Sequence, residues 1–159
     1  MKIRKMKKSE HKTGYLLIQL GNAVTWIRNQ KLQDKGLTSS QAGIIGYILK
    51  HGNRGLTPGD VAEGLNLSKA TVSEMLKTLE KKAFIERYGD VADGRRRKIF
   101  LTEQGSSWKE YLSNVATESE EVLLQGMTAE EQTEFNRLLC IALSNVSTCK
   151  GSELKGDLK

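Results

Sequence analysis

The residue types best suited to specific hydrogen bonding with a polyanion are concentrated in two neighbouring segments, 68–82 and 87–98. The first carries small hydroxyls and lysines off a stripe of apolar residues, and the second ends in Asp-Gly-Arg-Arg-Arg-Lys. Hydroxyls and carboxylates can bond base edges, whereas Lys and Arg bind phosphates. The two segments therefore predict contact with double-stranded DNA, the first in the major groove and the second on the minor groove and the backbone.

Several residues of the first segment lie off its apolar stripe and are expected to contact DNA. They are Ser68, Lys69, Ala70, Thr71, Ser73, Glu74 and Lys77. Thr71 and Ser73 suit base edges, and Glu74 can accept a hydrogen bond from a cytosine amino group. Ala70 suits a thymine methyl group, whereas the two lysines and Ser68 suit phosphates. A solvated helix face, which any amphipathic helix has, is the alternative.

The second segment is predicted to be a β-hairpin. Residues 85–88 and 98–101 form its strands, and residues 89–96 form a long turn. The expected DNA-binding residues here are Arg95, Arg96, Arg97 and Lys98. An arginine run is usually a solvated loop, but this one lies at the tip of a predicted hairpin beside a helix that suits DNA.

The elements that position these segments are helical. Val72, Met75, Leu76 and Leu79 recur at helical spacing, and Ser68 caps that helix. Thr57-Pro58 starts a short preceding helix, so the pair forms a helix-turn-helix. Further helices are predicted over 11–32, from the capping box 38–41, from Thr102 through Leu124, and from the capping box 128–131.

The predicted fold class is mainly α with a small β-hairpin, a winged helix-turn-helix with N- and C-terminal dimerisation helices. Residues 1–10 are expected to form a basic flexible tail and 149–159 a frayed C-terminal tail. Residues 37–102 form the DNA-binding lobe, and 11–36 with 103–148 form a helical dimerisation region. The outer helices have apolar stripes that a small core could not fully bury, so association between two chains is expected. The basic tail is equally compatible with an arm along DNA and a solubilising segment.

Composition supports a polyanion partner. The chain has 159 residues and a net charge of +6, with 20 Lys+Arg against 9 Asp+Glu in residues 1–100 and 5 against 10 in 101–159. No metal or other cofactor is expected, because two cysteines and two histidines show no ligand spacing. No phosphate-binding glycine loop or Ser/His/Asp grouping indicates an enzyme. The cysteine content and the absence of a signal peptide or long apolar run favour a cytoplasmic protein.

The pattern resembles the multiple-antibiotic-resistance regulator (MarR) family over residues 12–147. The segments that carry the resemblance are Leu37-Thr-Ser-Ser-Gln41, Leu56-Thr-Pro-Gly-Asp-Val-Ala-Glu-Gly-Leu-Asn-Leu-Ser68, Leu79-Glu-Lys-Lys82, Asp93-Gly-Arg95 and Leu101-Thr-Glu-Gln-Gly105. The resemblance implies a homodimeric winged-helix transcription regulator, usually a repressor released by a small molecule or by oxidation. It also implies that Arg95 reaches the minor groove and that Asp93 supports it.

The resemblance further implies an effector pocket between the dimer helices and the DNA-binding lobe. The candidates there are Trp26, Tyr47, His51, Trp108 and Tyr111, although aromatic residues at helical spacing are more often core. Two positions depart from the family pattern. Ala83 stands where glycine is common, which would cost about 1 kcal/mol if the backbone there is left-handed. Glu74 stands where a basic or neutral residue is frequent, which predicts an unusual preferred DNA sequence.

Two other function classes share these features. An architectural DNA-binding protein would share the charge but would recognise no sequence, and a winged-helix module could instead bind a protein partner. A redox sensor is not favoured, because Cys140 and Cys149 both lie late in the chain, whereas redox-sensing relatives usually carry their reactive cysteine in the first helix.

Overall fold

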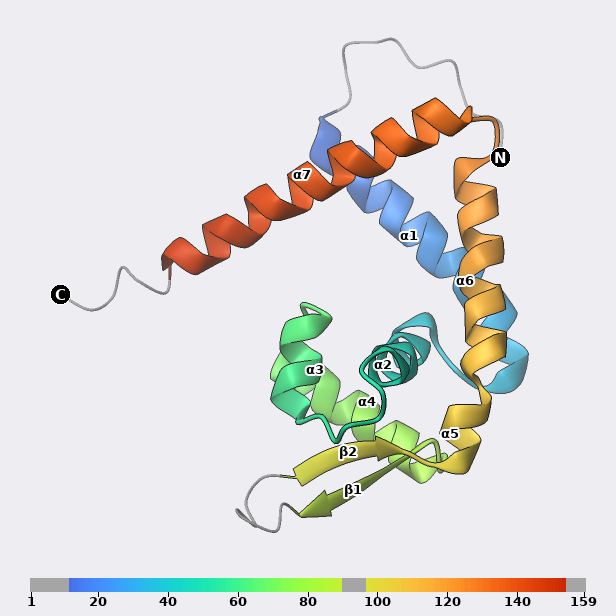
Figure 1. The fold of residues 1–159 in the computed structure, drawn as a ribbon, viewed down its shortest axis with the longest axis vertical. Coiled ribbons are helices and arrows are strands. Elements are labelled where there is room, and N and C mark those ends of the chain that lie inside the picture. The colour runs from blue at the N-terminus through green and yellow to red at the C-terminus, as the bar shows by residue number, and fades with distance from the viewer. Residues whose placement is uncertain (1–11, 90–96, 154–159) are drawn as a thin grey trace, which may run out of the picture. The chain divides into compact units, whose positions relative to one another are not determined.

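A computed structural model describes residues 12–89 and 97–153, and it confirms a mainly helical fold with one antiparallel hairpin (Figure 1). The chain divides into two compact units between Ser119 and Glu120, within α6. The elements, in chain order, are α1 (Thr13–Leu32), the 3-10 turn η1 (Gln33–Lys35), α2 (Ser39–Lys50), α3 (Pro58–Gly64), α4 (Lys69–Lys81), β1 (Ile85–Gly89), β2 (Arg97–Leu101), α5 (Glu103–Ser107), α6 (Lys109–Leu124) and α7 (Ala129–Glu153).

Helix starts follow the predicted caps. Thr38 and Thr57 each form a full capping box, with Gln41 and Asp60 respectively, and Pro58 occupies the first turn of α3. The Ser68 side chain accepts from the N–H of Thr71 at the start of α4. In the second unit the Thr128 hydroxyl accepts from the N–H of Glu131, whose carboxylate accepts from the N–H of Thr128 in return. These caps satisfy amide groups that the helix itself leaves unbonded, so they fix where each helix begins.

The core of the first unit lies between α2, α3, α4 and the hairpin. Its fully buried side chains come from every one of these elements and include Ile44, Ile45, Ile48, Val61, Val72, Leu76, Leu79, Ile85 and Ile99. The apolar stripe predicted for 68–82 therefore faces this core, and the polar residues of the same helix face outward. Figure 1 shows the hairpin at the lower edge of this unit, next to α4.

Besides its two strands, the hairpin pairs with a single residue of the preceding loop, which the sequence pattern did not predict. In the hairpin itself Ile85 pairs with Leu101, Arg87 with Ile99, and Gly89 with Arg97. On the other edge of β2, Leu56 forms an antiparallel bridge with Ile99 through N–H···O bonds of 3.2 and 2.7 Å. The Asn53 side chain extends this bridge, because its amide donates to the Leu101 carbonyl and accepts from the Leu101 N–H.

The junction between α4 and β1 adopts the strained backbone that the sequence indicated at Ala83. Its φ is +57°, in the left-handed region. The Thr102 hydroxyl donates to the Ala83 carbonyl at 2.6 Å and accepts from the N–H of Gly105. A Cβ at Gly105 would lie 2.1 Å from the Phe84 carbonyl oxygen. The close approach of α5 to this junction therefore requires glycine at that position.

One predicted helix was wrong in its extent. The helix expected from Thr102 through Leu124 is broken at Trp108, whose φ and ψ are −81° and −3°. Gly105-Ser106-Ser107 favours helix weakly, and the Trp108 ring packs edge-on against Phe84 at 5.0 Å. At the C-terminus, α7 ends at Glu153. No proline interrupts this helix.

The outer helices leave large apolar side chains exposed. Among the residues of α1 only Leu32 is buried, whereas Tyr15, Ile18 and Trp26 are exposed. In the second unit, the large apolar side chains of α7 that are exposed include Leu138, Ile141, Leu143 and Val146. The C-terminal part of α1 is attached to α6 by hydrogen bonds, from Tyr111 to the Lys31 carbonyl and from Arg28 to Ser119. In the described ranges, no helix has the length and apolar composition needed to cross a membrane.

Candidate nucleic-acid interface

Helix α4 and its cap residue Ser68 present the predicted DNA-facing residues on one side of the helix. Ser68, Lys69, Ala70, Thr71, Glu74 and Lys77 are exposed, and Ser73 is half-buried. The Ser68 oxygen accepts from the Thr71 N–H at 3.0 Å and lies 2.7 Å from the Thr71 hydroxyl oxygen. The cap therefore places two hydroxyls together at the helix N-terminus, where the backbone dipole also favours a phosphate.

Glu74 and Lys77 form an ion pair on this face. Lys77 Nζ lies 2.7 Å from Glu74 Oε1, and the two side chains are 60% and 73% exposed. They are three residues apart on a helix, which is the spacing that brings side chains together on one side. The candidate phosphate-binding lysine is thus engaged by the one acidic residue of the predicted contact set.

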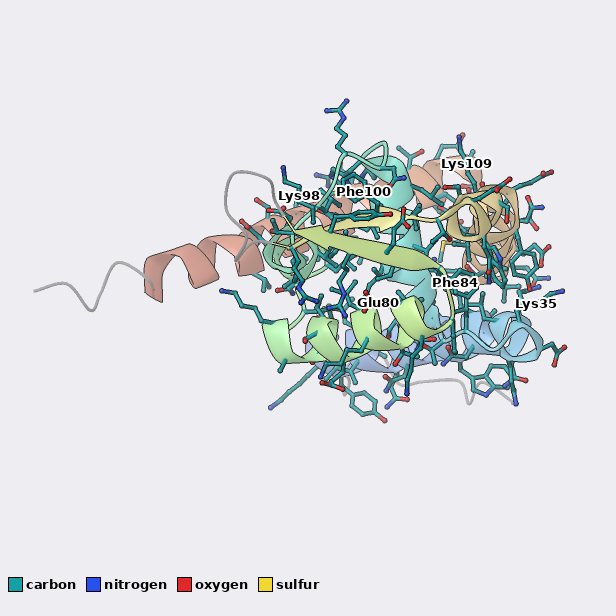
Figure 2. All side chains as sticks on the ribbon, turned by 90° about the horizontal axis from the view of Figure 1, so that it is seen from below. Lys35, Glu80, Phe84, Lys98, Phe100 and Lys109 are labelled. Carbon is teal, nitrogen blue, oxygen red and sulfur yellow. The ribbon has the colours of Figure 1, made fainter. Side chains whose placement is uncertain are left out.

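A second ion pair joins α4 to the hairpin. Arg87 on β1 donates through Nε, at 2.9 Å, and through Nη2 to the same carboxylate oxygen of Glu80. Figure 2 shows Glu80 on the side of α4 that faces the hairpin. The hydrogen bond from Arg87 lowers the pKa of Glu80, although burial acts in the opposite direction, and the same bond raises the pKa of Arg87. The orientation of the hairpin against the helix is therefore fixed by a charge-assisted contact.

The described part of the basic run starts at β2. Arg97 is exposed and lies opposite Gly89, and Lys98 is half-buried opposite Tyr88. Tyr88 and Phe100 contact each other edge-on at 5.9 Å on the hairpin, and Figure 2 shows Lys98 and Phe100 on the same strand. The other residues predicted for the wing, Asp93, Arg95 and Arg96, lie outside the described residues.

The structure does not gather the five predicted effector residues into one pocket. Trp26 is 64% exposed on α1, and Tyr47 contacts His51 with ring centroids 4.2 Å apart. Trp108 and Tyr111 form a separate edge-on pair at 5.4 Å. The five residues therefore lie at three separate places. The two pairs form because rings at helical spacing, three or four residues apart, pack against each other.

A cavity of about 170 Å³ lies instead between α1, α2 and α6, within the first unit. Its lining residues are Arg28, Leu32, Ser39, Ala42, Gly43, Gly46, Leu112, Val115 and Ala116. None of the five predicted aromatic or histidine residues is among them. The small residues of α2 at positions 42, 43 and 46 leave this space, and their spacing on one helix is the signal that could have located it.

Sequence reasoning also missed Glu80, Arg87 and Asn53 as residues that shape the interface. Glu80 belongs to the end of a helix, and Arg87 to a strand, so their contact depends on how the hairpin folds back. Asn53 has a φ of +54°, and asparagine tolerates that conformation better than most residues. In the described ranges, no group of three or more His, Cys, Asp and Glu side chains is placed to bind a metal ion.

Comparisons with known proteins agree with this geometry. The model of the MarR family matches residues 35–96. The chain is 28% identical to an uncharacterized HTH-type transcriptional regulator, YybA of Bacillus subtilis, over 80% of this chain and 83% of that protein. It is 25% identical to an HTH-type transcriptional repressor of Mycobacterium tuberculosis over 79% of this chain and 89% of that one.

A solved structure extends the match to nearly the whole fold. The structure of a complex of DNA with MepR from S. aureus superposes with a TM-score of 0.80 at 32% identity, covering 86% of this chain and 99% of MepR. A match over 86% of this chain extends well beyond a helix-turn-helix motif alone. The chain therefore belongs to the MarR family of winged helix-turn-helix transcription regulators, which are not enzymes.

Proposed function

We propose that this protein is a homodimeric, sequence-specific DNA-binding regulator that acts in the cytoplasm. The reading helix, residues 68–82, enters the major groove, and the wing, residues 87–98, contacts the minor groove and backbone. The observation that carries the proposal is the exposed polar face of α4 beside a basic hairpin that is tied to it by Glu80 and Arg87. MepR, which shares this fold, was solved in complex with DNA.

The DNA contacts follow the chemistry of each side chain. Ser68, Lys69 and Lys77 contact phosphates, and Ala70, Thr71, Ser73 and Glu74 face base edges. Arg95, Arg96, Arg97 and Lys98 supply the wing contacts, with Asp93 supporting Arg95. The exposure of the α4 residues, and of Arg97 on β2, is what such contacts require.

A homodimer accounts for the apolar faces of the outer helices. Exposed Tyr15, Ile18 and Trp26 on α1 would be buried against a second copy, as would the exposed apolar residues of α7. Two reading helices related by a two-fold axis match a pseudo-palindromic operator with half-sites about one helical turn, or 34–36 Å, apart. The dimerisation region would then comprise residues 11–36 and 103–148.

The protein acts as a repressor that a small molecule relieves. The cavity between α1, α2 and α6 is the site that supports this part of the proposal. Its wall is mostly apolar, and among the lining residues Arg28 alone is charged, so a compact, largely apolar molecule with one acceptor or anionic group would fit. A relative of M. tuberculosis is described as a repressor, which favours the same direction of control.

Selection of bound fragments from a genomic DNA library tests this function. The purified full-length protein and the variant Arg95→Ala are compared at near-physiological salt. An inverted-repeat motif, bound about 5- to 150-fold more weakly by the variant, is the expected result, as it corresponds to about 1–3 kcal/mol for a wing arginine in the minor groove. Diffuse binding without a motif, unchanged by Arg95→Ala, would instead indicate an architectural DNA-binding protein.

A further inference from the structure

Glu74 occupies the middle of the exposed face of α4, among side chains that otherwise suit a polyanion. It is the only carboxylate in the proposed contact set. Its side chain is 73% exposed, and its Oε1 lies 2.7 Å from Lys77 Nζ. The Glu74 carbonyl also accepts from the Thr78 hydroxyl at 3.1 Å, so this turn of the helix is bonded on both sides.

A carboxylate in the major groove has few acceptable partners. Guanine presents two acceptors there and thymine presents an acceptor and a methyl group, whereas only cytosine and adenine present an amino donor. Placed opposite acceptors and between phosphates, the Glu74 carboxylate is left without a hydrogen bond and with like charges near it. In the free protein that charge is compensated by Lys77.

Lys77 cannot serve two anions equally well. If it stays with Glu74, it neutralises no phosphate, and the salt dependence of binding is smaller by one contact. If it moves to a phosphate, Glu74 needs another donor. Only a base amino group at the right position satisfies both side chains at once.

We propose that Glu74 is a specificity-determining residue that keeps Lys77 from the DNA backbone until a cytosine or adenine amino group replaces the lysine. The inference rests on the proposed function, because it assumes that α4 enters the major groove. On a cognate site Glu74 bonds the base and Lys77 bonds a phosphate. On other DNA the Glu74–Lys77 pair persists, so non-specific affinity is held down.

The test uses fluorescence anisotropy of the full-length protein with two duplexes, the selected site and a scrambled duplex of the same composition, over a range of salt concentrations. The variants are Glu74→Gln, Glu74→Ala and Lys77→Gln. Glu134→Gln is the matched charge control, because Glu134 forms the same type of exposed pair, three residues from Arg137, and is not one of the proposed DNA contacts. Thermal unfolding of each variant verifies that the fold is retained. The unfolding midpoint should change little, because one exposed ion pair of this spacing contributes little to stability.

Removing the charge of Glu74 should release Lys77. Glu74→Gln and Glu74→Ala should bind the scrambled duplex about 10-fold more tightly, with a salt slope steeper by about one phosphate contact. The preference for the selected site should fall by a similar factor. Lys77→Gln should flatten the salt slope by about one contact on the selected site and leave it unchanged on the scrambled duplex. Glu134→Gln should match the native protein on both.

Three results would overturn the inference. In the first, Glu74→Gln leaves affinity and slope on the scrambled duplex unchanged. In the second, Lys77→Gln lowers the slope equally on both duplexes, which would show that Lys77 already binds phosphate without a cognate base. In the third, Glu74→Gln lowers the affinity for both duplexes by the same factor. Failure of the proposed function is a separate observation, because the native protein itself would then bind neither duplex or recognise no motif.

Discussion

Two guanidinium nitrogens of Arg87, on β1, donate hydrogen bonds to the same carboxylate oxygen of Glu80, on α4. This contact joins the hairpin to the reading helix. The Arg87 side chain is 16% exposed and that of Glu80 is 38% exposed. An ion pair in which a partly buried arginine donates twice resists rearrangement more than an exposed pair between a lysine and a carboxylate does. In the proposed complex, the wing and the reading helix would therefore reach DNA in one fixed relative orientation.

Glu80→Gln should destabilise the winged lobe. The substitution removes a charge-assisted bond and leaves the Arg87 guanidinium partly buried without its anion, which should cost about 1–2 kcal/mol after allowance for solvent exposure. Urea unfolding at neutral pH measures the loss. Glu134→Gln, in the exposed pair with Arg137, should change the unfolding free energy much less, because solvent screens that pair. Equal effects of the two substitutions would contradict this assignment.

The same pair should make stability depend on acid. Arg87 lowers the pKa of folded Glu80 below its ordinary 4.5, so the ionised form is favoured by folding. The ion pair stabilises the folded state fully at pH values above the ordinary pKa of 4.5. This stabilisation is lost as the pH falls through the lowered pKa of Glu80 in the folded state. The difference in unfolding free energy between the native protein and Glu80→Gln should therefore narrow from about pH 6 to about pH 3. A constant difference over that range would exclude a contribution from Glu80 ionisation.

Ala83→Gly should stabilise the protein. Alanine pays a steric penalty at a φ of +57°, whereas glycine does not. The gain is partly offset by the greater freedom of glycine in the unfolded chain, so we expect about 0.5–1 kcal/mol. Chemical denaturation of the two proteins at equal concentration gives the value. A lower midpoint for the glycine variant would mean that the native backbone is not strained there.

Gly105→Ala should have the opposite effect. The added Cβ would lie 2.1 Å from the Phe84 carbonyl oxygen, and a backbone atom cannot move aside as a flexible side chain can. Separation of α5 from the junction should cost about 2–3 kcal/mol. Gly59→Ala is the control, because a Cβ at that position meets only the Thr57 hydroxyl oxygen at 3.5 Å. The midpoints of thermal unfolding of the two variants are compared. Equal midpoints would contradict the close packing of Gly105 against the Phe84 carbonyl.

Local signals predicted most of the framework. Each cap and its helix depend on residues within one turn, so Thr38, Thr57, Ser68 and Thr128 marked helix starts correctly. The strain at Ala83 was indicated by the family resemblance, because glycine is common at this position in the family. These features require no knowledge of how distant segments meet.

Contacts between distant segments were not predictable from the same signals. The Glu80–Arg87 pair depends on the angle of the hairpin against α4, and the bonds of Asn53 to Leu101 join residues 48 positions apart. The break at Trp108 follows from packing on Phe84, which overrides the helical pattern of the surrounding residues. The cavity depends on missing side chains, which are harder to recognise in a sequence than aromatic ones.

Helix α1 buries only Leu32 fully, so little within one chain favours its N-terminal turns over disordered backbone. In the proposed dimer, the ordering of α1 and association would occur together. The amount of folded helix, the midpoint of thermal unfolding and the occupancy of an operator would then all rise with protein concentration. Expression level would become an input to regulation in its own right, because a cell that makes little of this protein would hold most of it as chains unable to present two reading helices.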